Sequence, residues 1–574
     1  MKRITFVLSL LALSAALWAV PAKRTRLKVQ LTDGTEVYVN TCGDEYFSWL
    51  LTDDQEVIEP APGRPGLYVR SQRTLRQVVE TTTSRRYVAR RLGSRETAPL
   101  PTVGSPKVPV VLVSFQDSVF HVGQTDEEVR TYYDLYCNGT RDGKRYTGHG
   151  SYGSIRDYFL GQSDSLFYPE FVVIGPVQLD NPVATYGKNS GSSHDSGYDR
   201  FVKEALAKAT AQYDGNWSDF DNKQKGNGNI DLIFFIFAGC GENTAQLQTD
   251  LMWPKESVNT KDVTLDDGTT LHFASSACTS ENSANKIENG KVVSVSPDGI
   301  GVMCHELSHA LGLPDFYDCN YTYFGMDVWS LMDYGCYVQN SKAPAGYTAY
   351  ERDFMGWRQL QELKEPGYYT LNPIASQDGV GMKITNPQNS NEYYVVEARL
   401  ASNWDKNLAR YGHGLQVTHV NYVASAWSNN TVNTGTAKQR MTIIAANNRY
   451  VGTSISANVA ELRETWAGNL YPYVYTDEQG EHRNDSLTAH STPAATVYSS
   501  SGIMPHTLTQ ISLSEDEQQA TFLFDGHLYD AVRELRDDDA TTDNHWFDLT
   551  GRRVGVPCKP GVYVVGNKKI ILTK

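Results

Sequence analysis

Two histidines and a glutamate stand close together near the middle of the chain, in the order His305-Glu306-Leu307-Ser308-His309. On an α-helix, side chains four residues apart point the same way, one turn above the other. His305 and His309 therefore have the spacing that a zinc ion needs. Zinc lowers the pKa of a bound water toward neutrality, and Glu306 would lie beside that water as a general base.

The residues after the second histidine supply a candidate third ligand. Gly312 allows the left-handed turn that stops a helix, and Asp315 follows where the chain can turn back toward the histidines. Three protein ligands leave the fourth zinc position open for water or substrate, which is typical of a catalytic site. If Asp315 is not the third ligand, Asp318 and Asp333 are the nearest substitutes.

A helix must present these ligands, and its start is predicted from three residues. Ser296 reads as the N-cap, Pro297 suits the first turn, and Asp298 suits the positive end of the helix dipole. An apolar stripe lies on the side opposite the histidines, so we expect core behind this helix and a cleft in front of it. The stripe consists of Ile300, Cys304, Leu307 and Leu311.

A second motif follows at Ser330-Leu331-Met332-Asp333-Tyr334. It resembles the Met-turn of the metzincins, in which a methionine forms an apolar floor under the metal ligands. Taken alone, Met332 would be read as an ordinary core residue. The resemblance implies that Met332 shapes the floor of the site and that Tyr334 stabilises the oxyanion of the reaction.

The longer segment 305–318 resembles the zinc motif of the immune inhibitor A-like family of secreted metallopeptidases. The resemblance extends over roughly residues 105 to 450. It implies a zinc endopeptidase with an N-terminal prosegment and a β-rich domain after the catalytic one. The other segments that carry it are 153–159, 162–163, 186–187, Asp231, 237–239 and 356–357.

Residues 1–22 are predicted to be a secretory signal peptide, because Met1-Lys2-Arg3 precede an apolar run at 4–20. Cleavage is expected after Ala19 or after Ala22. The alternative is an N-terminal membrane anchor, which so short a run disfavours. We therefore expect an extracellular protein, either free or held at the cell surface.

Residues 23–96 alternate short β-like runs with turns and are predicted to form a β-rich prosegment. The prosegment ends in an arginine-rich stretch at 84–95, which suits proteolytic activation. Cys42 and Asp44 are candidates for a zymogen switch, in which a thiolate or carboxylate occupies the open zinc position. The alternative is that both are ordinary turn residues.

Residues 97–366 are predicted to be the catalytic domain, with mixed α and β structure (α+β). The resemblance implies a metzincin-like fold, with a long zinc-binding helix and a mixed sheet. Continuous apolar runs predict buried strands, and apolar residues at helical spacing predict helices that back the sheet. The strands are at 108–115 and 230–237, and the helices at 125–136 and 198–213.

The chain after residue 366 changes to short strands separated by turn residues. Residues 367–526 are therefore predicted to be a sandwich-like β domain, followed by a charged linker at 527–545. Residues 546–574 resemble the β module that directs type IX secretion, which would make export machinery a partner. The alternative is a terminal strand pair that docks on the preceding domain.

The segment 219–231 resembles the family's calcium loop, in which oxygen-bearing side chains alternate with glycines. Lys223 and Lys225 occupy positions where the family usually has acids, which favours a simple loop rich in glycine and asparagine. The candidate calcium ligands are Asp221, Asn227, Asn229 and Asp231.

Composition limits the alternatives. The net charge of −14 argues against binding of nucleic acid, which requires a basic face. The 8 cysteines contain no C-x-x-C pair, so a second metal cluster is not expected, and their pairing stays open.

The leading hypothesis is a secreted zinc endopeptidase that is made as a zymogen and acts on proteins or peptides. A second hypothesis is a surface adhesin or binding protein built on a catalytically silent peptidase scaffold. A third is a peptidase that acts only on its own prosegment. The presence of Glu306 argues against the scaffold, which would be free to lose it.

Overall fold

The computed structural model describes most of the chain. Much of the predicted signal peptide, most of the arginine-rich stretch, the linker at 527–545 and Cys558 lie outside the described residues. The residues described are 16–18, 20–83, 93–140, 142, 144–190, 194–223, 227–245, 247–258, 261–265, 268–288, 291–526, 546–548, 553–554, 561–565 and 568–572.

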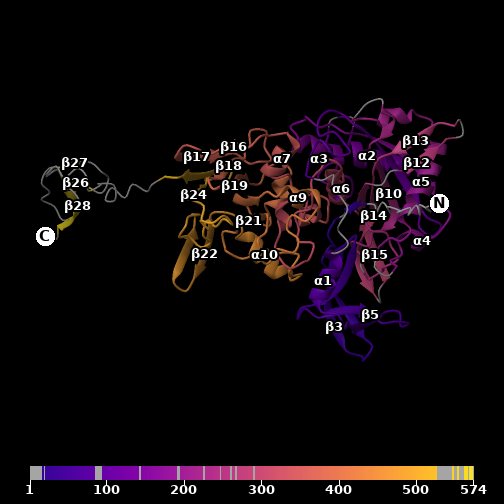
Figure 1. Cartoon of the computed structure of the whole chain (residues 1–574), viewed down its shortest axis with the longest axis horizontal. Helices are drawn as coiled ribbons and strands as arrows, with labels where there is room; N and C mark the ends of the chain where they lie inside the picture. The colour runs from indigo at the N-terminus through magenta and orange to yellow at the C-terminus, as the bar shows by residue number, and fades with distance from the viewer. Residues whose placement is uncertain are drawn as a thin grey trace, which may run out of the picture.

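A 7-stranded mixed sheet forms the centre of the predicted catalytic domain, residues 97–366, which is called the catalytic body below (Figure 1). Its strand order is β1-β11-β14-β10-β7-β8, and β15 pairs with β14. Strands β14, β10, β7 and β8 run parallel, whereas β11 and β15 run antiparallel to β14. The strands are β1 Ala16–Trp18, β7 Lys107–Ser114, β8 Glu170–Gln178, β10 Ile233–Cys240, β11 Lys255–Val258, β14 Ser276–Glu288 and β15 Lys291–Pro297.

Alternate residues of the central strands face two different cores. On β10, Phe234 and Ile236 pack on one side with α2, α3 and α6, while Phe235 and Phe237 pack on the other side with α5. Because successive side chains of a strand point to opposite faces, a strand covered on both faces is apolar throughout, as the sequence predicted. The helices are α2 Asp126–Asn138, α3 Ile155–Gln162, α5 Tyr198–Gln212 and α6 Gly301–Ala310.

The predicted start of the zinc-binding helix is wrong. Helix α6 begins at Gly301 and has 10 residues, with no side-chain cap at Ile300. Ser296 and Pro297 instead end strand β15, where they pair with Ser283 and Asn282. The hairpin of β14 and β15 therefore uses the residues that local preference assigned to a helix N-terminus.

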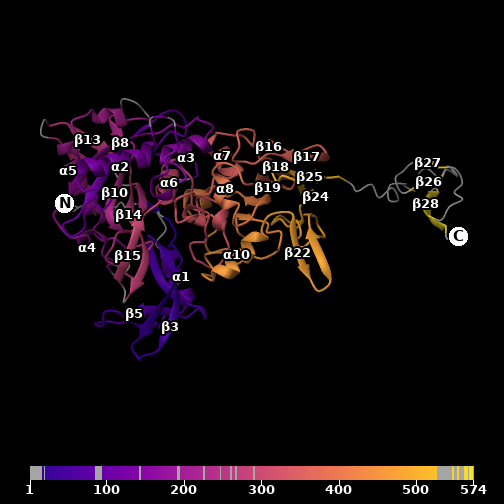
Figure 2. The same cartoon turned by 180° about the vertical axis from the view of Figure 1, so that it is seen from behind.

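The predicted prosegment forms a closed barrel of strands β2 to β6, below the catalytic body in Figures 1 and 2. Its strands are β2 Arg26–Leu31, β3 Glu36–Asp44, β4 Phe47–Thr52, β5 Val57–Pro60 and β6 Leu67–Arg70, and helix α1 Leu75–Thr83 follows. Alternating residues fill the barrel, as the strand pattern predicts. They include Val29, Leu31, Val39, Leu50, Ile58 and Tyr68.

Two sheets form the body that follows the catalytic one, and a single apolar core joins them. Such an arrangement is sandwich-like, with each sheet turning one face inward. One sheet has the order β16 Gln361–Glu362, β18 Met382–Asn386, β19 Asn389–Arg399, β20 Gly414–Asn421 and β21 Met441–Ile443. The other has the order β17 Gly367–Leu371, β25 Ala520–Phe524 and β24 Leu508–Leu513.

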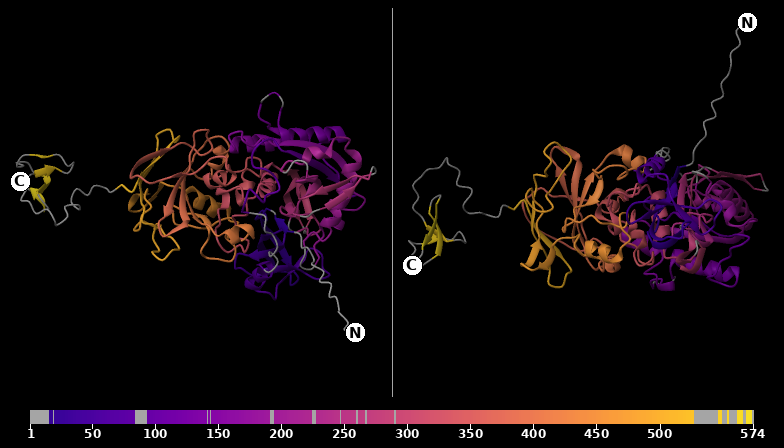
Figure 3. Two further views of the ribbon diagram at one scale, coloured as in Figure 1. Left: turned by 45° about the horizontal axis from the view of Figure 1, so that its top comes forward. Right: turned by 90° about the horizontal axis from the view of Figure 1, so that it is seen from below.

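The catalytic and second bodies lie against each other and share a core (Figure 3). Val395, Trp427 and Met441 of the second body belong to the same buried cluster as Cys304 and Phe316 of the catalytic body. A buried ion network adds to this contact. Arg399 lies 3.4 Å from Glu397 and from Asp405 and donates to the carbonyl of Gly346 in the catalytic body.

The smaller elements complete the fold. A three-stranded sheet joins β12 Lys261–Thr264, β13 Thr270–Phe273 and β9 Asn229–Ile230. A hairpin joins β22 Tyr473–Asp477 and β23 Gly480–Asn484, and a four-stranded terminal sheet contains β27 Arg553–Val554, β26 Trp546–Asp548, β28 Gly561–Val565 and β29 Lys568–Leu572. The remaining α-helices are α4 Ala184–Gly187, α7 Ala349–Met355, α8 Asp405–Leu408, α9 Ala424–Ser428 and α10 Val459–Ala467.

Within the described part of the chain, no helix combines the length and the apolar character that crossing a lipid bilayer requires. The cysteines in that part are all buried and free of disulfide bonds. They are Cys42, Cys137, Cys240, Cys278, Cys304, Cys319 and Cys336.

Candidate metal centre

His305, His309 and Asp315 converge at the end of α6. The two Nε2 atoms are 3.1 Å apart, and Oδ1 of Asp315 lies 3.1 Å from Nε2 of His305 and 3.3 Å from Nε2 of His309. All three side chains are buried. In the described part of the chain, this is the group of three or more His, Cys, Asp or Glu side chains that could hold a metal ion.

The three atoms fit a zinc ion. Tetrahedral zinc with ligand bonds of about 2.0–2.1 Å requires ligand atoms about 3.3 Å apart, close to the observed triangle. Oδ1 of Asp315 is buried and accepts no hydrogen bond, so it is left without the partner that a buried carboxylate needs. A cation at the centre of the triangle would satisfy it.

Backbone carbonyls fix the orientation of both imidazoles. Nδ1 of His305 lies 2.8 Å from the carbonyl of Leu331, and Nδ1 of His309 lies 2.7 Å from the carbonyl of Leu313. A carbonyl oxygen can only accept a hydrogen bond, so each Nδ1 must carry the proton and donate it. The lone pair of each Nε2 then faces the triangle. Burial also lowers the pKa of His305 and so favours the neutral ring that a metal requires.

Asp315 carries the negative charge of the ligand set. Burial alone would raise the pKa of Asp315, but the neighbouring imidazoles of His309 and His305 lower it overall. The carboxylate is therefore the favoured form.

The turn after α6 brings Asp315 back to the histidines. Gly312 has φ of +105°, and a Cβ atom there would lie 2.9 Å from the carbonyl oxygen of Ser94. The N–H of Leu313 donates to the carbonyl of Ser308, which closes the turn. Only glycine adopts this conformation without strain, so the role predicted for Gly312 is confirmed.

Glu306 lies beside the triangle and is fully buried. Its Oε1 accepts the backbone N–H of Val20 at 3.0 Å, while Oε2 has no hydrogen-bond partner in the described chain. Burial raises the pKa of Glu306 far above its usual value; the Val20 hydrogen bond acts against this rise, and the charge of Asp315 adds to it.

The segment that reaches Glu306 comes from the far N-terminal side of the chain. Val20, Pro21 and Ala22 are buried, and β1 just before them pairs antiparallel with the edge strand β11. Side chains of the catalytic body bind the segment. Nε1 of Trp253 donates to the carbonyl of Val20, Tyr337 donates to that of Pro21, and Tyr321 accepts from the N–H of Ala22.

The sequence does not predict this contact, because residues 16–22 continue an apolar run that is typical of a signal peptide. An apolar run does not distinguish a segment that is removed from one that docks in a cleft. The earlier of the two predicted cleavage positions could have indicated the contact, because cleavage after Ala19 leaves Val20 to Ala22 on the exported chain.

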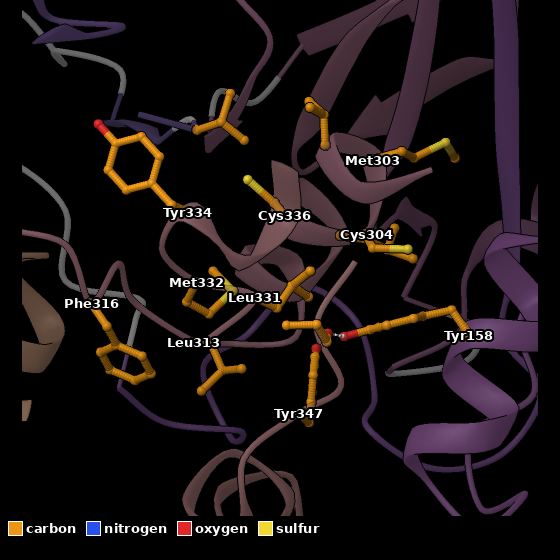
Figure 4. Close-up of a cluster of buried hydrophobic side chains, with 14 of the residues drawn as sticks. Tyr158, Met303, Cys304, Leu313, Phe316, Leu331, Met332, Tyr334, Cys336 and Tyr347 are labelled. Carbon is orange, nitrogen blue, oxygen red and sulfur yellow. Dashed lines mark hydrogen bonds between the residues drawn. The ribbon is translucent and has the colours of Figure 1, made fainter. Parts of the chain in front are cut away.

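The Met-turn motif packs directly against the ligands. The N–H of Phe316 donates to the carbonyl of Met332 at 2.8 Å, so the turn supports the Asp315 side of the triangle as well as His305. The ring of Tyr334 is directed away from Met332 and Leu331 (Figure 4). Its buried hydroxyl has no hydrogen-bond partner in the described chain, so an oxyanion role for Tyr334 stays a prediction.

The candidate zymogen-switch residues are not part of the metal group. Cys42 is buried, with Sγ 3.9 Å from the carbonyl of Asn40, and burial raises the pKa of its thiol. Asp44 accepts the N–H of Tyr46 at 3.0 Å. Glu45, the residue after Asp44, was not a candidate in the sequence. It is buried, and burial and the charge of Asp315 raise its pKa.

The substitute ligands bind backbone instead of the triangle. Asp318 accepts the N–H groups of Asn320, Thr322 and Tyr323. Asp333 accepts those of Met326 and Asp327.

Three of the candidate calcium ligands also accept hydrogen bonds from backbone N–H groups. Asp221 accepts from Gly228, Asp231 accepts from Asn222 and Lys223, and Asn227 accepts from Asn229. Lys225 lies outside the described residues. Calcium binding therefore stays a prediction.

Comparison with known proteins agrees with the site. The chain is 26% identical over 275 residues to the Vibrio cholerae protein named pre-pro-metalloprotease PrtV, covering 43% of this chain and 29% of that protein. It is 25% identical over 305 residues to immune inhibitor A of Bacillus thuringiensis subsp. alesti, covering 46% of this chain and 42% of that protein. The chain thus matches less than half the length of each relative.

The same segment matches a family model. Residues 96–361 match the model described as the catalytic domain of immune inhibitor A peptidase M6. His305, Glu306, His309 and Asp315 all lie within the matched residues. This segment therefore resembles the catalytic domain of the immune inhibitor A peptidase M6 family.

Proposed function

We propose that this protein is an exported, zinc-dependent endopeptidase that is made as a zymogen. The observation that carries the proposal is the triangle formed by two imidazole nitrogens and one carboxylate oxygen, with Glu306 beside it. A zinc peptidase site by itself accounts for the burial and the orientation of these four side chains.

His305, His309 and Asp315 would hold the zinc, which supplies Lewis acidity for a peptide carbonyl and an attacking water. Glu306 would take a proton from the attacking water and later give it to the leaving amine. Glu306 meets the backbone N–H of Val20 beside the triangle. A substrate peptide would take that place.

The same contact supports the zymogen proposal. Val20 to Ala22 are buried beside Glu306, and Tyr321 links them to the barrel that follows, because its hydroxyl bonds the carbonyl of Gly43 as well as Ala22. Cleavage in the arginine-rich stretch would release the prosegment and open the cleft. The name of the Vibrio relative, pre-pro-metalloprotease PrtV, agrees with this order of events.

Export rests on the charge-then-apolar order of residues 1–20, with cleavage after Ala19 so that Val20 to Ala22 stay on the precursor, and on the β module at 546–574, which would engage export machinery. The described part of that module is a small four-stranded sheet. Protein or peptide substrates are proposed from the family of the catalytic domain.

Casein hydrolysis by the processed protein tests the proposal. We expect turnover that a chelator abolishes, that added zinc restores, and that Glu306→Ala lacks while zinc content stays equal to the wild type. Turnover that survives the chelator or Glu306→Ala would overturn the proposal. A processed, zinc-loaded protein that cleaves nothing would support the binding-protein hypothesis, and one that cleaves only its own prosegment would support the third.

A further inference from the structure

Asp315 makes two hydrogen bonds with a side chain from outside the predicted catalytic domain. Nδ2 of Asn430 donates to Oδ2 of Asp315 at 2.5 Å, and Oδ1 of Asn430 accepts the backbone N–H of Asp315 at 2.7 Å. Both residues are buried. The amide thus contacts the side chain and the main chain of one residue at once, which fixes the direction of the carboxylate.

Asn430 belongs to the second body, well beyond the matched segment 96–361. It follows helix α9 in a left-handed conformation, with φ of +54°, which asparagine tolerates better than most residues. Its N–H donates to the carbonyl of Trp427, and the Trp427 ring packs 6.4 Å from that of Phe316. The position of the amide is therefore fixed from both bodies.

The two oxygens of Asp315 have different partners. Oδ2 accepts the Asn430 amide, whereas Oδ1 accepts no hydrogen bond and faces both imidazoles. The hydrogen bond to Oδ2 favours metal coordination through the other oxygen, Oδ1. Single-oxygen coordination keeps the ligand count at three and leaves room for water.

We propose that Asn430 is a positioning residue for the metal site, supplied by the second body. It holds Asp315 so that Oδ1 alone completes the triangle. The proposal rests on the proposed function only in taking Asp315 as a zinc ligand. Partners that orient ligands in this way contribute about 10–100-fold to metal affinity.

Asn430→Gly removes both hydrogen bonds and keeps the left-handed backbone. Its matched control is Thr442→Val, a nearly isosteric change that also removes one hydrogen bond between the bodies, that of Thr442 to the carbonyl of Gly325, but touches no ligand. The full-length chain would be compared for zinc affinity by chelator competition, for the visible absorption bands of the Co²⁺-substituted protein, and for the Tm of the metal-free form.

We expect Asn430→Gly to raise the zinc Kd about 10–100-fold and to change the Co²⁺ bands. Thr442→Val should keep both at wild-type values, even if its Tm falls. Wild-type Kd and bands in Asn430→Gly would overturn the proposal, as would equal changes in the control.

If Asn430→Gly fails to fold, Asn430→Asp replaces it. Aspartate has nearly the same size, tolerates the left-handed backbone, and keeps the acceptor for the N–H of Asp315, but it lacks the donor to Oδ2. Altered Co²⁺ bands support the proposal and unchanged bands overturn it. A wild type that binds neither zinc nor cobalt contradicts the proposed function itself, whereas a zinc-binding wild type with unaltered variants contradicts only the role of Asn430.

Discussion

Each residue of the triangle has one atom that faces the centre and a second atom that makes a hydrogen bond elsewhere. His305 and His309 use the carbonyls of Leu331 and Leu313, and Asp315 uses Asn430. The ligands themselves could be predicted because their types and spacing form a motif. Their supports could not, because a backbone carbonyl has no signature in the sequence and Asn430 lies 115 residues from Asp315.

The choice of Asp315 over Asp318 can be tested by exchanging each for asparagine. Asp315→Asn removes the charge of the ligand set at almost constant volume, so we expect the zinc Kd to rise by more than about ten-fold. Asp318→Asn changes a carboxylate that accepts backbone N–H groups and lies outside the metal group, so its zinc Kd should match the wild type. Chelator competition on both purified variants gives the answer, and the reverse pattern would identify Asp318 as the ligand.

At the scale of elements, strands and helices with a strong pattern were predicted well. Strand β7 and helices α2 and α5 lie where continuous apolar runs and helical spacing placed them. The start of α6 was not predictable, because Ser296 and Pro297 satisfy both a helix N-terminus and the end of β15. Pairing with β14, a contact distant along the chain, decides between them.

The turn after α6 gives a prediction at this scale. Gly312→Ala forces a side chain into a left-handed conformation and against the carbonyl of Ser94, a strain of about 1–3 kcal/mol. We expect a lower Tm together with weaker zinc binding, because Asp315 follows the turn. Gly104→Ala is the control: its φ is +89° and nothing lies within 4 Å of the added Cβ. It should lower only the Tm, and equal zinc loss in both variants would show that the turn does not position the ligand.

At the scale of the whole molecule, the barrel of strands β2 to β6 contacts the catalytic body through an aromatic pair. The Trp49 ring meets that of Tyr321 edge-on at 5.3 Å, and Tyr321 in turn bonds Gly43 and Ala22. The sequence predicted a β-rich prosegment but not this docking, because its partners lie more than 270 residues apart in the chain.

Trp49→Ala should therefore weaken latency. Replacing a buried tryptophan by alanine lowers the free energy of unfolding by about 3–5 kcal/mol. Part of this loss falls on the contact that docks the barrel. We expect the unprocessed precursor to hydrolyse a fluorogenic peptide faster than the wild-type precursor does. Tyr38→Ala, a change of similar kind at a side chain 52% exposed on the same barrel, should leave that rate unchanged. Equal rates in all three precursors would contradict a docking role for Trp49.

The buried cluster that joins Trp427 and Val395 to Phe316 has a consequence for how the protein comes apart. Heat should melt the peptidase body and the strands behind it in one cooperative endotherm, so that a calorimeter records a single peak for residues 97–526. A fragment that ends near residue 366 would expose to water the apolar face that Trp427 covers, and it should precipitate rather than behave as a smaller enzyme.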